Sequence, residues 1–168
     1  MSNQKGFTLI ELLVAVAIIA ILASVIMTMS SNARNNAKDA AIRRQFAEFT
    51  KLLLQEYVDN GTYANLQLPA TYFYTKEDCE SGFTSSVYVS EARAICKEIV
   101  KNLNNGAFYV GANNPSSQKY SISTNLNTPV YLSGNPTGHD YCVGSSGTYD
   151  GTSVGNGSQT QKGCYNNP

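Results

Sequence analysis

The apolar positions of the first 60 residues predict one continuous helix with two different halves. Neither Gly nor Pro, the residues that most often end helices, occurs from Phe7 to Asp59. Residues 7–29 are almost entirely apolar and are long enough to cross a bilayer. Residues 30–60 are amphipathic. Their large apolar side chains recur at helical spacing and form one stripe: Ile42, Phe46, Phe49, Leu53 and Tyr57.

The helix is expected to end at Asn60-Gly61, because Gly61 can adopt a positive φ. Two i,i+4 ion pairs of modest value are expected on its surface, Asp39–Arg43 and Arg44–Glu48. At 1.5 Å per residue, a helix of this span would be roughly 80 Å long.

Residues 61–168 have the pattern of a compact head. A second, shorter helix is predicted over 88–103, and turn residues separate the short apolar runs that follow it. Four of these runs are predicted strands: Ala107–Gly111, Lys119–Leu126, Pro129–Leu132 and Asp140–Val143. We interpret Lys76–Glu80 as a solvated loop and residues 144–168 as a Gly/Ser/Asn-rich tail. The simplest architecture is α+β, with a small antiparallel sheet packed on the stripe of the long N-terminal helix.

Charge narrows the classes of function. The net charge is zero and charged residues make up 14% of the chain, against about 25% in ordinary soluble proteins. A neutral chain has no broad field to attract nucleic acid, and no basic cluster or aromatic-basic patch indicates nucleic-acid binding. Past residue 104 the chain has only four charged side chains: Lys119, Asp140, Asp150 and Lys162.

The cysteines indicate disulfide bonds. There are four, with no Cys-x-x-Cys pair, and the chain has a single histidine, His139, so a zinc site has little support. Four cysteines allow three connectivities. Pairing of sequence neighbours would give Cys79–Cys96 and Cys142–Cys164, and each bond would close a loop of about 20 residues, worth about 3 kcal/mol. Disulfides fit a head that lies outside the cytoplasm.

Glu11 is the unexpected residue of the apolar segment. A carboxylate inside a membrane segment is costly and is usually functional. The segment could be a plain membrane anchor, with Glu11 partly hydrated near the headgroups or protonated. It could also be a signal peptide with Lys5 as its charged flank and cleavage near Ala23, but it is long for one and Glu11 interrupts it.

The run Lys5-Gly6-Phe7-Thr8-Leu9-Ile10-Glu11 resembles the processing site of type IV pilins and of the pseudopilins of type II secretion. It has a short leader with a basic residue, then Gly-Phe, a Glu four residues after Phe, and an unbroken apolar run. The resemblance covers about residues 1–60. Over the head it concerns architecture only: a helical stem, an antiparallel sheet and a C-terminal disulfide loop.

The resemblance implies a structural subunit and no enzymatic activity. A prepilin peptidase would remove the leader, residues 1–6, by cutting after Gly6, and would N-methylate Phe7. Lys5 would help to hold the leader in the cytoplasm. Residues 7–29 would anchor the precursor in the cytoplasmic membrane and later form the filament core, with residues 30–60 and the head, 61–168, outside. Glu11 would pair with the N-terminal amine of a neighbouring subunit.

The partners implied are further copies of the chain, the peptidase, an assembly ATPase and a platform protein. The product would be a surface pilus used for adhesion, twitching motility or DNA uptake. A short periplasmic pseudopilus and a membrane-anchored binding domain that never polymerises are the alternatives.

Four basic residues just past the membrane segment would place that side in the cytoplasm by the positive-inside rule. The cysteines and the leader favour the opposite orientation.

Other residue combinations are weaker candidates for sites. His139-Asp140 could be half of a hydrolytic triad, but the chain has one histidine and a serine-rich tail in which chance neighbours are common. Asp150 with Ser153 and Asn156 offers one carboxylate, where a calcium site needs several charged oxygen ligands. We therefore expect no catalytic site, no metal ion and no cofactor.

Overall fold

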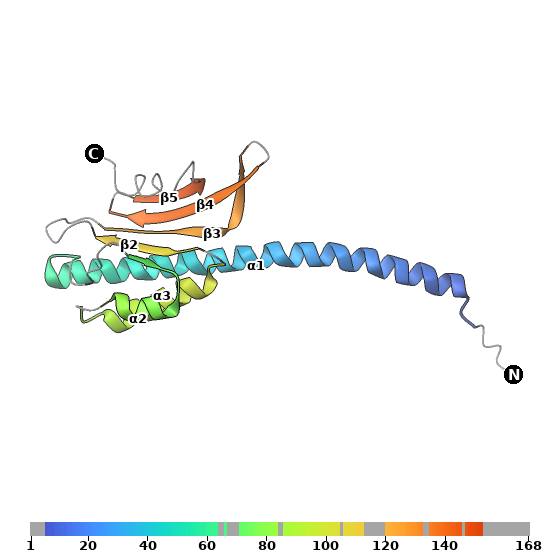
Figure 1. Ribbon diagram of the computed structural model, residues 1–168, viewed down its shortest axis with the longest axis horizontal. Helices are drawn as coiled ribbons and strands as arrows, with labels where there is room; N and C mark the ends of the chain where they lie inside the picture. Colours follow the sequence, from blue (N-terminus) through green and yellow to red (C-terminus); the bar gives the residue numbers. More distant parts are fainter. Residues whose placement is uncertain are drawn as a thin grey trace. The chain divides into compact units, whose positions relative to one another are not determined.

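The computed structural model describes residues 6–63, 66, 71–83, 86–104, 106–112, 120–132, 135–145 and 147–152. The chain divides into two compact units, Met1–Asn35 and Asn36–Pro168, and helix α1 runs through both. The second unit contains two short helices and one sheet (Figure 1). The elements in chain order are α1 (Leu9–Asn60), β1 (Thr71–Phe73), α2 (Lys76–Gly82), α3 (Val89–Asn102), β2 (Phe108–Ala112), β3 (Tyr120–Leu132), β4 (Asn135–Gly144) and β5 (Gly147–Thr152).

Helix α1 confirms the predicted continuous helix. It begins two residues after Phe7 and ends at Asn60. Gly61 follows with φ +68°, in the left-handed region, and its N–H donates to the Tyr57 carbonyl at 2.8 Å. A glycine C-cap of this kind is what the Asn60-Gly61 pair predicts. Helix α3 likewise confirms the shorter helix expected over 88–103.

The sheet is an antiparallel meander with the strand order β1-β2-β3-β4-β5. The two strands expected over Lys119–Leu126 and Pro129–Leu132 form one strand, β3, whose register against β4 shifts between Leu126 and Val130. Strand β4 is longer than expected and begins at Asn135. Strands β1 and β5 were not anticipated, and β5 lies in the stretch interpreted as a tail. It pairs with β4 from Gly147↔Gly144 to Thr152↔His139.

The sheet packs on the predicted stripe of α1. Ile42, Phe46 and Phe49 are fully buried and Leu53 is 2% exposed. Phe108 of β2 contacts the rings of Phe46 and Phe49, with ring centroids 5.5 and 5.6 Å apart. Burial of this aromatic surface stabilises the packing of the sheet on α1.

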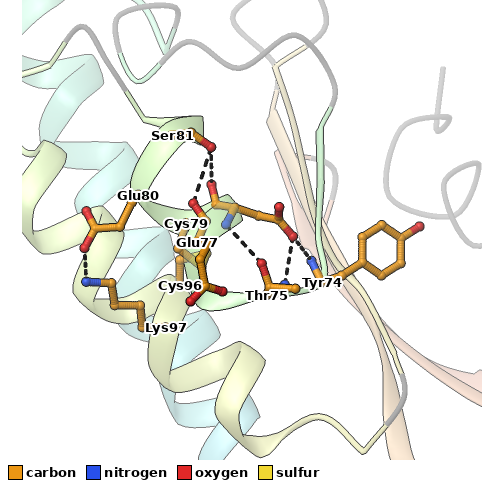
Figure 2. The surroundings of a disulfide bond; sticks show 9 residues. Tyr74, Thr75, Glu77, Cys79, Glu80, Ser81, Cys96 and Lys97 are labelled. Carbon is orange, nitrogen blue, oxygen red and sulfur yellow. Dashed lines mark hydrogen bonds and ion pairs between the residues drawn. A yellow bond between two sulfur atoms is a disulfide. The ribbon is translucent and has the colours of Figure 1, made fainter.

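Helix α2 corrects the interpretation of Lys76–Glu80 as a loop. Thr75 is its N-cap, and its hydroxyl accepts from the Asp78 N–H while the Asp78 carboxylate accepts from the Thr75 N–H. This reciprocal capping box can start a helix as short as the seven residues of α2. The buried disulfide Cys79–Cys96 then joins α2 to α3, as Figure 2 shows, and confirms one of the two pairings of neighbours.

Asp39 does not pair with Arg43 as its spacing suggests. Its side chain is buried, 4% exposed, and holds the irregular part of β3 against α1. Oδ1 accepts from the backbone and side-chain N–H groups of Asn127 at 2.7 and 2.9 Å, and Oδ2 accepts from the Thr128 N–H at 2.9 Å and from the Thr128 hydroxyl. The other expected pair, Arg44–Glu48, is present at 3.2 Å.

We expect Asp39→Ala to destabilise the head by about 2 kcal/mol, because the N–H groups of Asn127 and Thr128 lose their acceptor in a partly buried place. Asp39→Asn keeps one acceptor oxygen and should cost less. The urea midpoint, followed by tyrosine fluorescence, measures the difference. Equal midpoints for Asp39→Ala and the wild type would mean that β3 does not depend on this carboxylate.

Candidate functional site

The peptide bond expected to be cleaved lies outside the helix. Gly6, Phe7 and Thr8 are not helical, and Phe7 is 82% exposed. A Cβ added to Gly6 would meet no atom within 4 Å, so the fold of the chain does not itself require glycine at this position. Lys5 and the four residues before it lie outside the described residues.

Glu11 forms a capping box with Thr8 at the start of α1. Its Oε2 accepts from the Thr8 N–H at 2.9 Å and from the Thr8 hydroxyl at 2.7 Å, and the Glu11 N–H donates to the Thr8 hydroxyl at 3.3 Å. The helix therefore begins at Leu9, three residues after Gly6. The Thr-x-x-Glu spacing carries this signal in the sequence, although no role was predicted for Thr8.

The first half of α1 presents apolar side chains on all sides. Large apolar residues from Phe7 to Met29 are between 48% and 82% exposed. An 18-residue window of this helix has a mean hydropathy of 3.0, and by length and composition it is the one helix among the described residues that could cross a membrane. Such a surface needs lipid or other protein to cover it.

A shallow hollow of about 420 Å³ lies on this surface, and Glu11 is the only ionisable group in its lining. The rest of the lining is apolar: Phe7, Ile10, Val14, Ala15 and Ile18. A carboxylate at the edge of an apolar hollow is suited to a partner with a positive charge beside an apolar group.

The remaining candidate residues have structural partners. His139 does not act with Asp140. Its Nε2 lies 2.6 Å from Asp150 Oδ1, and Asp150 is also bound by both terminal nitrogens of Arg43, a residue of α1. The Arg43 guanidinium covers the Tyr141 ring at 4.7 Å. Asp150 is therefore engaged in holding β5 to α1.

No group of three or more His, Cys, Asp or Glu side chains that could hold a metal ion occurs within the described ranges. Ser153 and Asn156, the other residues considered for calcium, lie outside those ranges. So does Cys164. Cys142 is disulfide-bonded, and its pairing with Cys164 stays a prediction.

The Arg43–Asp150 pair gives the head an acid-sensitive contribution to stability. The Arg43 guanidinium holds the pKa of the Asp150 carboxyl below its usual value, with a smaller contribution from His139. In the pH window below about 4, the unfolded chain therefore binds more protons than the folded chain, and stability falls as the pH falls. Both side chains are more than a third exposed, so the contribution at neutral pH is below about 1 kcal/mol.

We expect Asp150→Asn to lower the urea midpoint at about pH 7, and we expect this difference from wild type to be smaller at about pH 3, because the advantage of the ionised pair declines as the pH falls below the usual pKa of the Asp150 carboxyl. Urea titrations of both proteins at the two pH values measure this. A difference between variant and wild type that is as large at low pH as at neutral pH would rule out the ionised pair as its source.

The architecture and the N-terminal motif together define a class of protein. A long N-terminal helix, apolar and uncovered in its first half, leads into a head in which an antiparallel sheet packs on the second half. This is the type IV pilin fold. Residues 1–27 match the family described as "Prokaryotic N-terminal methylation motif".

The chain is 34% identical over 96 residues to the type IV wide pilus major component PilA4 of Thermus thermophilus. The alignment covers 57% of this chain and 72% of the relative. No solved structure matches the chain significantly. The chain belongs to the type IV pilin family, whose members are structural subunits.

Proposed function

We propose that this chain is the precursor of a filament subunit, cut between Gly6 and Phe7 and N-methylated on Phe7. The observation that carries the proposal is the uncovered apolar half of α1 with one carboxylate, Glu11, in its first turn. Before assembly, residues 7–29 anchor the subunit in the cytoplasmic membrane with residues 30–60 and the head, 61–168, outside. After assembly the same residues pack against those of other copies.

The proposed role of Glu11 is to pair with an N-terminal amine. Cleavage creates a positively charged amine on Phe7, in an apolar environment where an unpaired charge costs several kcal/mol. The Thr8 hydroxyl and N–H both bind Oε2 of Glu11, which fixes the orientation of the carboxylate. The carboxylate could then neutralise the amine of an adjacent subunit only when that subunit lies at one position along the filament axis. In that position the Phe7 ring of the adjacent subunit would lie in the apolar hollow.

The assembled filament is proposed to be a surface pilus. In support, the relative from Thermus thermophilus is described as the major component of a wide pilus. The peptidase, an assembly ATPase and a platform protein are the proposed partners. Long filaments on cells would distinguish a pilus from a short periplasmic pseudopilus, and an uncut chain that stays in the membrane would indicate an anchored domain that does not polymerise.

The intact mass and N-terminal residue of the protein extracted from its native membrane test the processing step. We expect a chain that begins at N-methyl-Phe7 and gains four hydrogens on reduction, two for Cys79–Cys96 and two for the predicted bond of Cys142 with Cys164. A chain that begins at Met1, in cells whose peptidase processes another substrate, would contradict the proposal.

Gly6→Val is expected to block cleavage, because a branched side chain keeps the peptidase from the backbone. Since a Cβ at Gly6 would meet no atom of the described residues within 4 Å, the substitution should not disturb the fold, and Gly6→Ala serves as a milder control. The ratio of uncut to cut chain in membranes, measured by mass, should rise from wild type to Gly6→Ala to Gly6→Val. Complete processing of Gly6→Val would show that the site lies elsewhere.

A further inference from the structure

Three tyrosines form an aromatic surface at the β1 edge of the sheet. Tyr72 of β1 packs on its cross-strand neighbour Tyr109 of β2, which is itself buried, with ring centroids 4.9 Å apart. Tyr72 also lies beside Tyr74, with centroids 6.3 Å apart and planes 27° from parallel. Tyr72 is 48% exposed and Tyr74 is 63% exposed. We call Tyr72, Tyr74 and Tyr109 the tyrosine platform.

The platform is held in place by its backbone. Tyr72 is fixed by the pairing of β1 with β2. The Tyr74 N–H donates to the Asp78 carboxylate at 2.9 Å, the same group that caps α2, and Figure 2 shows the Tyr74 ring projecting away from that helix. Exposed tyrosines on a fixed backbone lose little conformational entropy on binding, which is why they are common in protein interfaces.

A second exposed surface lies on the outer side of α1, within the head. Leu54 is 46% exposed and Val58 is 76% exposed. Lys51 is also exposed, and it lies on the same helical face because it comes three residues before Leu54 and seven before Val58. We call Lys51, Leu54 and Val58 the helix face. It combines apolar side chains with a cation, the chemistry that pairs with aromatic rings.

The two surfaces lie on opposite sides of the head. Strand alternation directs Tyr72 away from α1, because its neighbour Phe73 is fully buried in the core between the sheet and α1. The helix face is turned away from the sheet, which packs on the opposite side of α1 at Phe46 and Phe49. A single head therefore cannot bring its platform onto its own helix face.

We propose that the tyrosine platform of one copy of this chain binds the helix face of a second copy. The Lys51 ammonium lies over a platform ring, and Leu54 and Val58 pack against the ring of Tyr74. Because the two surfaces differ and lie on opposite sides, the contact is head-to-tail and repeats without closing into a dimer. The contact rests on the proposed function, since it supplies an interaction between the heads of neighbouring subunits within the filament.

Photocrosslinking in assembling cells tests this contact without relying on a loss of function. p-Benzoyl-phenylalanine replaces Tyr74, and after irradiation the crosslinked dimer from sheared filaments is digested and sequenced by mass spectrometry. We expect the crosslink to fall within residues 51–58 of a second copy. The same amino acid at Ser90, an exposed residue of α3, is the control and should not give that product.

Filaments that form but crosslink Tyr74 to another segment, or to another protein or a glycan, would overturn the contact and leave the proposed function standing. A cut or uncut chain that never forms filaments would overturn the proposed function and the contact with it. These two failures are separated by electron microscopy of the same cells.

Matched variants test which side-chain groups make the contact. Lys51→Glu and Tyr74→Ala should each lower the yield of sheared filaments by about fivefold, and Tyr74→Phe, which keeps the ring, should stay near wild type. Head stability, from urea titration, should be unchanged in all three. The proposal would be contradicted if the filament yield changed with head stability and did not depend on an aromatic ring at position 74.

Discussion

Glu11→Ala is expected to leave cleavage after Gly6 intact and to reduce filament yield by at least about 100-fold. Removing one partner of a buried ion pair costs about 3–5 kcal/mol, because the other charge, here the amine, stays buried without a counter-ion. Each 1.4 kcal/mol or so changes an equilibrium constant about tenfold, so this cost corresponds to at least about a 100-fold loss of assembly. The peptidase is expected to tolerate the change because the Gly6–Phe7 bond precedes the helix that Glu11 caps.

Two variants separate the charge of Glu11 from its helix cap. Glu11→Gln keeps an oxygen that can accept from Thr8 and removes the negative charge. Thr8→Ala removes the hydroxyl and keeps the charge. If the charge is what assembly needs, Glu11→Gln should resemble Glu11→Ala, and Thr8→Ala should reduce yield only severalfold, consistent with a helix cap worth about 1 kcal/mol.

The measurement is the amount of subunit in sheared filaments, relative to cut subunit in the membrane, with the N-terminal mass as the control for processing. Wild-type filament yield from a correctly cut Glu11→Ala chain would show that the amine is neutralised in another way. Glu11 would then be a helix cap without a role in assembly.

Phe108→Ala is expected to destabilise the head by about 3–5 kcal/mol, as for other buried phenylalanines. Phe108 is fully buried and contacts Phe46 and Phe49 of α1 and Phe73 of β1. Removing its ring leaves a cavity where the helix and two strands meet, and those elements cannot close it without moving the backbone.

The loss is measured as a change in urea midpoint on the full-length protein in detergent. The chain has 11 tyrosines and no tryptophan, so tyrosine fluorescence and near-UV circular dichroism are the available signals. Val87→Ala, at an 81% exposed position, is the control and should change stability by less than about 0.5 kcal/mol. A similar small effect for Phe108→Ala would mean that the aromatic cluster is not the core of the head.

The long helix and its buried stripe could be predicted because both depend on local sequence. A stretch without Gly or Pro and a repeat of three and four residues are sufficient to indicate them. Helix α2 was missed although its signal, Thr75 three residues before Asp78, is also local. The charged run that contains it was interpreted by composition alone, and seven residues are too few for helical periodicity to be visible.

Strands β1 and β5 could not be predicted from local sequence. Thr71–Phe73 has three residues, and Gly147–Thr152 contains two glycines, so neither has the alternation of a strand. Their pairing depends on neighbours that come from other parts of the chain. Arg43 and Asp150 are likewise 107 residues apart, and no spacing rule connects an arginine on a helix with an aspartate on the last described strand.

The N-terminal residues, in contrast to β1 and β5, could be selected from the sequence alone. Gly6, Phe7 and Glu11 were selected from sequence because they form a contiguous family motif, and the order of residues in such a motif can be recognised without tertiary contacts. Thr8 was overlooked because Glu11 was interpreted through its charge, whereas the structure shows that its carboxylate also caps the helix.

The meander order of the sheet has a consequence for how the head folds. From β2 onward, each strand pairs with the one that precedes it in the chain, so only β1 has to wait for a later strand before it can pair. Helix α1 precedes all of them, and its stripe is available from the start as a template for the sheet. Folding of the sheet from β2 to β5 can therefore follow the order of the chain, with short connections closing and little loop entropy lost at each step.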